Sequence, residues 1–160
     1  MARKDRSFIK EAFLTAFMKG AEKNEVKQYV ENFWKRFLPR HLNKKAMQKL
    51  NWHRDHGHQV YIISASFEFY ISCLKNVLPV DGIFGTKAQW QNDILTGRLL
   101  GKNCKDDEKV IRLEKELGIN LNSVCYYAYS DSDSDIPLLK NAAFAFKVNS
   151  KGITPWWPQK

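Results

Sequence analysis

The chain has 160 residues, enough for one domain with a buried core, and its 44% hydrophobic and 13% aromatic residues exclude a disordered protein. A formal charge of +9 favours anionic partners: phosphorylated metabolites, nucleic acid or anionic lipid surfaces. Because the Lys and Arg residues are scattered and no zinc-finger or RNA-recognition signature is present, a dedicated nucleic-acid surface is disfavoured.

The cysteines and the hydropathy of the chain indicate its cellular environment. Cys73, Cys104 and Cys125 are an odd number at spacings that fit neither a disulfide framework nor a zinc site, so we expect reduced thiols. No run of about 18 apolar residues could span a bilayer, and the N-terminus lacks the apolar segment of a signal peptide. We therefore expect a cytoplasmic protein without a transmembrane segment.

The first third of the chain is expected to be helical. Apolar residues recur at helical spacing over residues 8–19, 24–38 and 42–56. Gly20, Pro39 and Gly57 mark the expected helix ends. Aromatic residues on the first two helices are expected to pack in a core, and not to bind a cofactor. We predict a helical unit over residues 1–57.

After residue 57 the period of the sequence changes. Strands are expected over residues 59–63, 124–129 and 143–148, with two or three short strands and a hairpin between 82 and 100. Helices are expected over residues 67–78, 108–117 and 136–140. This alternation predicts an α/β fold with parallel βαβ units and right-handed crossovers.

A cluster of carboxylates follows the strand expected at residues 124–129. Asp131, Asp133 and Asp135 alternate with serines and lie directly before a short helix. Ligands bind beyond the carboxyl ends of strands in an open α/β sheet, and oxygen-only ligands suit Mg²⁺. The alternative, which the stretch alone leaves open, is a solvated turn whose Ser and Asp side chains cap helices.

Three polar features have matching positions in the expected topology. Ser64 follows one strand, Lys109 lies in the first turn of a helix, and Asp131 with Asp135 follows another strand. A hydroxyl donor, a lysine and a carboxylate-held Mg²⁺ together suit the neutralisation of a transferring phosphoryl group. Ser64 and Ser66 have an alternative role as caps of the following helix.

The order of these features resembles the haloacid dehalogenase superfamily of phosphohydrolases, in its phosphoserine-phosphatase-like branch. The segments that carry the resemblance are residues 61–66 (YIISAS), 103–110 (NCKDDEKV) and 129–139 (YSDSDSDIPLL), which are similar to the second, third and fourth family motifs. The resemblance implies a phosphoric monoester hydrolase with a Rossmannoid three-layer sandwich around a parallel sheet. It also implies a helical cap, of which residues 1–57 are a remnant, and a core over residues 58–160.

The resemblance also implies roles for single residues. Ser64 and Ala65 would bind phosphoryl oxygens, and Lys109 would offset charge on the phosphoryl group and the nucleophile. Asp131 would bind Mg²⁺, and Asp135 would support the metal shell or orient Lys109. The implied substrate is a phosphorylated small molecule or a phospholipid head group.

One family feature is missing from the 160 residues. The first motif, Asp-x-Asp-x-Thr, supplies the attacking aspartate and the general acid/base in family members, and this sequence does not contain it. Asp5 and Asp55 are the only aspartates before Ser64, and no apolar strand precedes Asp5. We interpret the chain as an N-terminally shortened member that lacks the central first strand and is inactive or impaired. The sheet would then be closed by direct pairing of the strands before Ser64 and Asp131 in a rearranged sheet, or by an intermolecular contact such as a homodimer or swapped dimer.

Two further classes of function stay open. The chain could be a noncatalytic regulatory protein that keeps the phosphate site, or a basic nucleic-acid-binding domain. Strongly salt-dependent affinity for DNA or RNA would indicate the latter.

Overall fold

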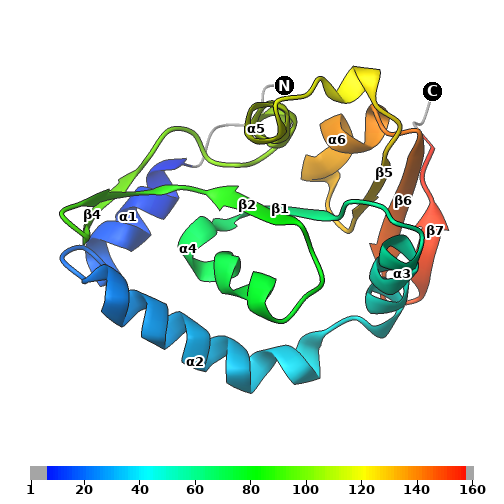
Figure 1. The fold of residues 1–160 in the computed structure, drawn as a ribbon. Coiled ribbons are helices and arrows are strands. Elements are labelled where there is room, and N and C mark those ends of the chain that lie inside the picture. Colours follow the sequence, from blue (N-terminus) through cyan, green and yellow to red (C-terminus); the bar gives the residue numbers. More distant parts are fainter. Residues whose placement is uncertain (1–6, 158–160) are drawn as a thin grey trace.

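The computed structural model describes residues 7–157, as an α/β fold whose helices lie on both sides of the strands (Figure 1). Three long helices come first: α1 (Ser7–Phe17), α2 (Lys23–His41) and α3 (Lys44–Asp55). The later helical segments are α4 (Glu68–Ile71), η1 (Ser72–Asn76), α5 (Asp107–Leu117), η2 (Leu121–Ser123), η3 (Asp133–Asp135) and α6 (Ile136–Lys140). No helix within 7–157 is long and apolar enough to cross a membrane.

The strands form three small sheets. They are β1 (Tyr61–Phe67), β2 (Gly82–Thr86), β3 (Ala88–Gln91), β4 (Ile94–Leu99), β5 (Tyr127–Ser130), β6 (Phe144–Asn149) and β7 (Gly152–Pro155). β1 pairs with β2 in parallel, and β3 and β4 form an antiparallel hairpin. β6 lies between β5, its parallel partner, and β7, its antiparallel partner. The α/β class and the parallel pairing are confirmed.

The strand that carries Ser64 and the strand that precedes Asp131 are not neighbours in a ladder. β1 pairs only with β2, and β5 pairs only with β6, among the strands that the structure describes. Side chains join them instead: Tyr61 and Ile63 of β1 pack on a buried cluster that includes Leu113 of α5 and Ala128 of β5. Within residues 7–157 no strand lies between β1 and β5 in a ladder, and each has one edge without a strand partner there.

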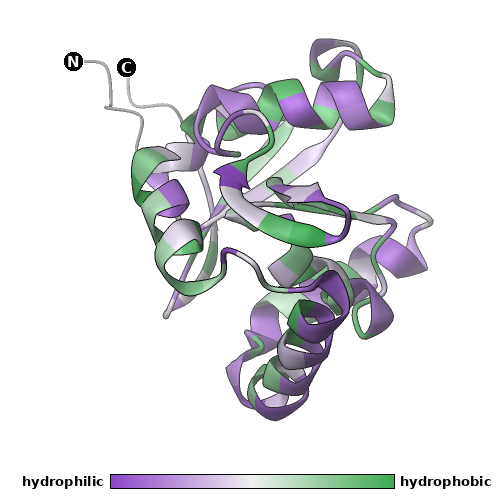
Figure 2. Ribbon diagram, turned by 90° about the vertical axis from the view of Figure 1, so that its left-hand side faces the viewer, coloured by the Kyte–Doolittle hydropathy of each residue, from purple (hydrophilic) through white to green (hydrophobic). Residues whose placement is uncertain are grey.

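Two further clusters hold the N-terminal helices against the strands. Leu14 of α1, fully buried, packs with Ala88 and Leu95 of the β3–β4 hairpin. Residues of α2 and α3 pack on a second cluster around Ile71 and Leu74. Figure 2 shows hydrophobic segments at the centre of the molecule, where the strands lie. The division into units 1–57 and 58–160 stays a prediction, and the first six residues of the first unit lie outside the described part.

The predicted buried face of α1 is wrong. Its aromatic residues are exposed, Phe8 by 65% and Phe17 by 77%, whereas Leu14 is buried. Leu14 and Met18 pack on the β3–β4 hairpin, and Lys10 donates to the carbonyl of Ala65 in β1, so hydrophobicity alone does not identify the inner face of α1. On α2 the prediction holds in part: Val26 and Val30 are buried and Trp34 packs on the cluster around Ile71, whereas Tyr29 is 76% exposed.

Several predicted boundaries also change. α2 continues through Pro39 to His41, because the proline lies in an exposed last turn where water can solvate the carbonyl that loses its partner. The helix expected over residues 67–78 is a short α-helix followed by a 3-10 turn. β7 was not predicted; it forms a hairpin with β6 through a turn that Asn149 stabilises by accepting from the amides of Lys151 and Gly152.

Candidate active site

A buried ion pair joins two of the predicted site residues. The Nζ atom of Lys109, in the first turn of α5, lies 2.5 Å from Oδ1 of Asp135, which directly precedes α6. Both side chains are about nine-tenths buried, so little water screens the pair. The fold therefore brings together a lysine and an aspartate that are 26 positions apart (135 − 109).

Two serines complete the hydrogen bonding of Asp135. Ser130 Oγ, at the end of β5, donates to Oδ2 at 2.6 Å, and Ser134 Oγ donates to Oδ1 at 3.2 Å. Ser132 Oγ in turn accepts from the amide of Ser134 at 3.2 Å. The alternation of Ser and Asp in this stretch thus does two things: it caps the η3 turn and it fixes a carboxylate beside Lys109.

The second part of the site is the end of β1. The register between β1 and β2 shifts between Ile63 and Phe67, so residues 64–66, which we call the Ser64 loop, bulge out of the ladder. Within it, Ser64 Oγ accepts from the amide of Ser66 at 3.0 Å. Ser64 thus lies within β1 and does not follow it. Its side chain stabilises this turn, and α4 has no side-chain cap.

A polar cluster behind the Ser64 loop was not predicted. Thr86 Oγ1, fully buried, donates to the carbonyl oxygen of Ala65 at 2.7 Å and also lies 3.0 Å from Asn103 Oδ1. Lys10 of α1 donates to the same three oxygens: Ala65 O, Thr86 Oγ1 at 3.1 Å and Asn103 Oδ1 at 2.7 Å. The only sequence signal was the position of Lys10 four residues before Leu14, on the inner face of α1.

The groups around Lys10 determine its charge. Burial lowers the pKa of Lys10 from 10.5 to about 8; the nearby Cys104 opposes this shift, and the positive charges of Lys105 and Arg112 add to it. Burial raises the pKa of the Cys104 thiol, which therefore stays neutral near pH 7. Arg112 bonds to Glu108 at 2.9 Å and to the carbonyl of Gly85. The end of β1 is thus a positively charged region.

Asp131 is the remaining predicted site residue, and it is exposed at the start of the loop after β5. Both oxygens of Asp135 bond to Lys109, Ser130 or Ser134. Residues 7–157 contain no group of three His, Cys, Asp or Glu side chains placed to hold a metal ion. Asp131 therefore fits as one Mg²⁺ ligand, but the described residues do not fit a complete shell. Asp5 lies outside the described residues.

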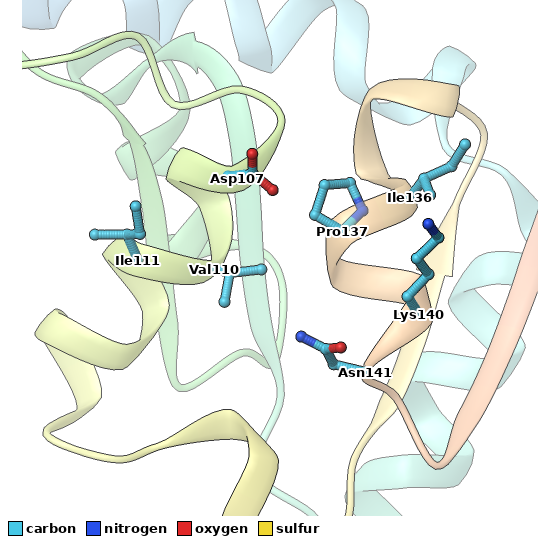
Figure 3. Close-up of a pocket in the computed structure, with 7 residues that line it drawn as sticks. All are labelled: Asp107, Val110, Ile111, Ile136, Pro137, Lys140 and Asn141. Atoms are coloured by element: carbon cyan, nitrogen blue, oxygen red, sulfur yellow. The ribbon is translucent and has the colours of Figure 1, made fainter.

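A shallow groove lies beside the site, between α5 and α6 (Figure 3). Its lining is mainly apolar, with the charged ends of Asp107 and Lys140 at its margin. None of the predicted site residues lines it. The groove is therefore not the candidate phosphate site.

A separate cluster of histidines contacts the side of the β5–β7 sheet. His53 of α3 is buried; its Nδ1 lies 2.8 Å from Nδ1 of His58, and its Nε2 lies 3.0 Å from the hydroxyl of Tyr129. Burial lowers the pKa of His53, and the neighbouring His58, Lys49 and His56 lower it further. This cluster is structural: it links α3 to β5.

The family follows from comparison with known proteins. A family model described as haloacid dehalogenase-like hydrolase matches residues 2–140, most of the chain. The chain belongs to this family. The resemblance to the haloacid dehalogenase superfamily that the sequence motifs indicated is confirmed.

Individual relatives support the same assignment. The protein CicA of Caulobacter vibrioides is 28% identical over 137 residues, which are 85% of this chain and 61% of that protein. A phosphoserine phosphatase of Mycobacterium tuberculosis is 28% identical over 137 residues, 84% of this chain and 44% of the enzyme. The chain thus spans between two fifths and three fifths of the length of these relatives.

A solved structure confirms the fold. A protein of unknown function from Bordetella pertussis superposes with a TM-score of 0.79 at 21% identity, over 90% of this chain and 66% of that one. At this identity the likeness concerns the fold alone. It shows that the arrangement of α1 to α3 with the strands also occurs in a larger chain.

Proposed function

We propose that this chain forms the phosphate-binding and charge-neutralising part of a phosphoric monoester hydrolase site. The observation that carries the proposal is the buried Lys109–Asp135 pair at the end of β5, in a chain of this family. A lysine held in place by a carboxylate and two serines is preorganised, so it needs no rearrangement to meet a developing negative charge.

For the single site residues we propose the roles that the family resemblance implies. Ser64 and Ala65 would bind phosphoryl oxygens, because they lie in the bulge that ends β1. Lys109 would offset the charge of the phosphoryl group, and Asp135 would orient Lys109. Asp131 would contribute one ligand to Mg²⁺, whose remaining ligands the described residues do not supply, and no step is derived through the ion.

The proposed substrate is a phosphorylated small molecule or a phospholipid head group, handled in the cytoplasm. Hydrolysis in family members proceeds by attack of an aspartate on phosphorus and release of the phosphoryl group from an aspartyl-phosphate by water. The 160 residues contain no Asp-x-Asp-x-Thr motif to supply that aspartate. We therefore expect the chain by itself to bind phosphate and not to turn over a phosphate ester.

Calorimetric titration with inorganic phosphate tests the binding. Loss of a hydrogen bond to a charged group costs about 1.5–3 kcal/mol, so Ser64→Ala should weaken binding by tenfold or more. Ser72→Ala, an exposed serine on η1, is the matched control and should bind as the wild type does. A wild-type chain that takes up no phosphate would refute the proposal.

Hydrolysis is measured separately, with p-nitrophenyl phosphate and Mg²⁺. We expect no turnover above the uncatalysed rate. If turnover is observed and Asp131→Asn abolishes it, another carboxylate of the chain acts as the nucleophile, and the account of the missing motif is wrong.

A further inference from the structure

Lys10 places an ammonium group behind the Ser64 loop. All three of its protons are directed at neutral oxygens, the Ala65 carbonyl, the Thr86 hydroxyl and the Asn103 amide. The ring of Phe67, 5.4 Å from Nζ, covers another side. The described residues thus solvate this cation with dipoles and do not neutralise it with a carboxylate.

The neighbouring cations differ from Lys10 in this respect. Lys109 is paired with Asp135, and Arg112 is paired with Glu108. Part of their positive charge is offset by these carboxylates before a ligand arrives. Glu11, next to Lys10 on α1, accepts from the amide of Leu99 at 3.0 Å. Among these three cations, Lys10 is therefore the one that no carboxylate of the described residues pairs with.

We propose that Lys10 is a positioning residue: its ammonium group fixes the Ala65 carbonyl, attracts a phosphoryl group to the Ser64 loop, and makes phosphate affinity depend on its own protonation. The inference rests on the proposed function, since it assumes that the phosphoryl group binds at Ser64 and Ala65. It gives α1 a role in phosphate binding, although Lys10 lies outside the three motifs that resemble those of the family.

The titration of Lys10 supports this coupling. Because burial holds its pKa at about 8, the amine changes charge in a range where most other lysines stay protonated. The titratable and charged groups that face it from the segment before α5 and from α5 itself are Cys104, Lys105 and Arg112. A phosphate beside Ala65 would stabilise the ammonium form and raise this pKa. By reciprocity, protonation of Lys10 must strengthen phosphate binding.

The test is calorimetric titration with inorganic phosphate between roughly pH 7.5 and 9.5, where the ligand is a dianion and Lys10 titrates. If phosphate raises the pKa of Lys10 by about one unit, affinity of the wild type should fall by about sixfold across this range, toward a limit of about tenfold. Lys27→Met, which removes an exposed lysine of α2, is the control and should follow the wild type.

Two substitutions of Lys10 complete the test. Lys10→Met should bind weakly at every pH, with no slope. Lys10→Arg keeps its charge over the whole range, so its affinity should not fall with pH. Wild-type affinity and slope in Lys10→Met would overturn the proposal.

A measurement on the wild type alone needs no variant to fold. At pH near 8, phosphate binding should draw a fraction of a proton from the buffer, seen as a binding enthalpy that depends on the ionisation enthalpy of the buffer. A binding enthalpy independent of the buffer would also overturn the proposal.

The failure of this inference and of the proposed function can be told apart without phosphate. Because the folded pKa of Lys10 lies below its unfolded value, the unfolded chain binds more protons between about pH 8 and 10.5, and stability contributed by this group rises with pH there. Wild type should show this rise in thermal unfolding, and Lys10→Met should lack it. If the rise is present but phosphate never binds, the proposed function fails while the description of Lys10 stands; if it is absent, the inference fails.

Discussion

Asp135 shows how much depends on a single side chain. Its two oxygens accept bonds from Lys109, Ser130 and Ser134, and all of these groups are largely buried. Removal of one member of such a set leaves an uncompensated charge in a poorly solvated place.

We predict that Asp135→Asn lowers the free energy of unfolding by about 3 kcal/mol or more, because Lys109 then stays buried without a counter-charge. The matched control is Asp133→Asn: Asp133 pairs with Lys147 at 2.8 Å but is 72% exposed, so its loss should cost about 1 kcal/mol or less. Urea denaturation of both variants measures the difference. Equal losses would contradict a special role for the buried pair.

His53 gives a prediction for acid pH. Its folded pKa is lowered, so the unfolded chain binds more protons than the folded chain once pH falls through the ordinary value of 6.5. Stability should therefore decrease as pH falls from about 7 to 5, because burial and then the neighbouring basic side chains disfavour the protonated form of His53. Thermal unfolding as a function of pH checks this.

His53→Gln should flatten that pH profile, whereas His41→Gln on the exposed end of α2 should leave it unchanged. A profile with the wild-type slope in His53→Gln would assign the acid sensitivity to other groups.

At the residue scale, polar groups in motifs at strand ends could be identified from the sequence. Polar groups that reach the site only through tertiary contacts could not. Lys109 was expected in the first turn of a helix, and it lies there, paired with Asp135. Lys10 could not be found in this way, because its partners Ala65 and Asn103 lie 55 and 93 positions away. The roles of the site residues stay predictions.

The bounds of helices and strands were predicted well where turn residues mark their ends. The faces that they bury were predicted poorly, because packing against other elements determines them. Gly118, with φ of 66°, ends α5 as expected, and the 136–140 helix was exact in both bounds. The inner face of α1 was wrong because a lysine, not a phenylalanine, points inward. Hydrophobic periodicity detects a helix but does not tell which neighbour it meets.

The contact of β2 with the end of β1 and the start of α4 is a second case that only the structure reveals. A Cβ atom on Gly85 would lie 2.8 Å from the carbonyl oxygen of Ser66 and 2.9 Å from Cα of Glu68, and backbone atoms cannot easily move away. On Gly82, a Cβ would meet only the rings of Tyr61 and Phe84, at 3.1 Å.

We therefore predict that Gly85→Ala costs about 2–3 kcal/mol of stability and weakens phosphate binding by displacing the Ser64 loop. Gly82→Ala, on the same strand, should cost less and leave phosphate affinity unchanged. Denaturation and calorimetry on the two variants provide the comparison. A larger loss of stability and phosphate affinity in Gly82→Ala than in Gly85→Ala would contradict the prediction, because it would show that the Ser64 loop can move to accommodate a side chain on Gly85.

At the scale of the whole molecule, the open edges of β1 and β5 are the main departure from an unbroken parallel sheet. Unpaired strand edges are sites for association with another chain. The sequence predicted the missing central strand from the absent first motif, but it could not tell whether β1 and β5 would then pair directly.

We predict concentration-dependent association of the purified chain through these edges, giving a homodimer or swapped dimer. Sedimentation velocity over about a hundredfold range of concentration measures it, and hydrogen exchange locates it: the amides of β1 and β5 should become protected as the dimer forms. A single monomeric species throughout, with β5 amides already protected, would contradict the prediction.

The side-chain cluster around Leu113 has a mechanical consequence. Among the described residues no backbone ladder joins β1 to β5. The side chains of α5 and its buried neighbours therefore connect the sheet that carries the Ser64 loop to the sheet that precedes Asp135. The distance between the two halves of the candidate site is then set by how tightly the side chains of this cluster pack. A strand inserted beside β1 and β5, or an anion that contacts both halves of the site, would therefore fix this distance and the phosphate affinity together.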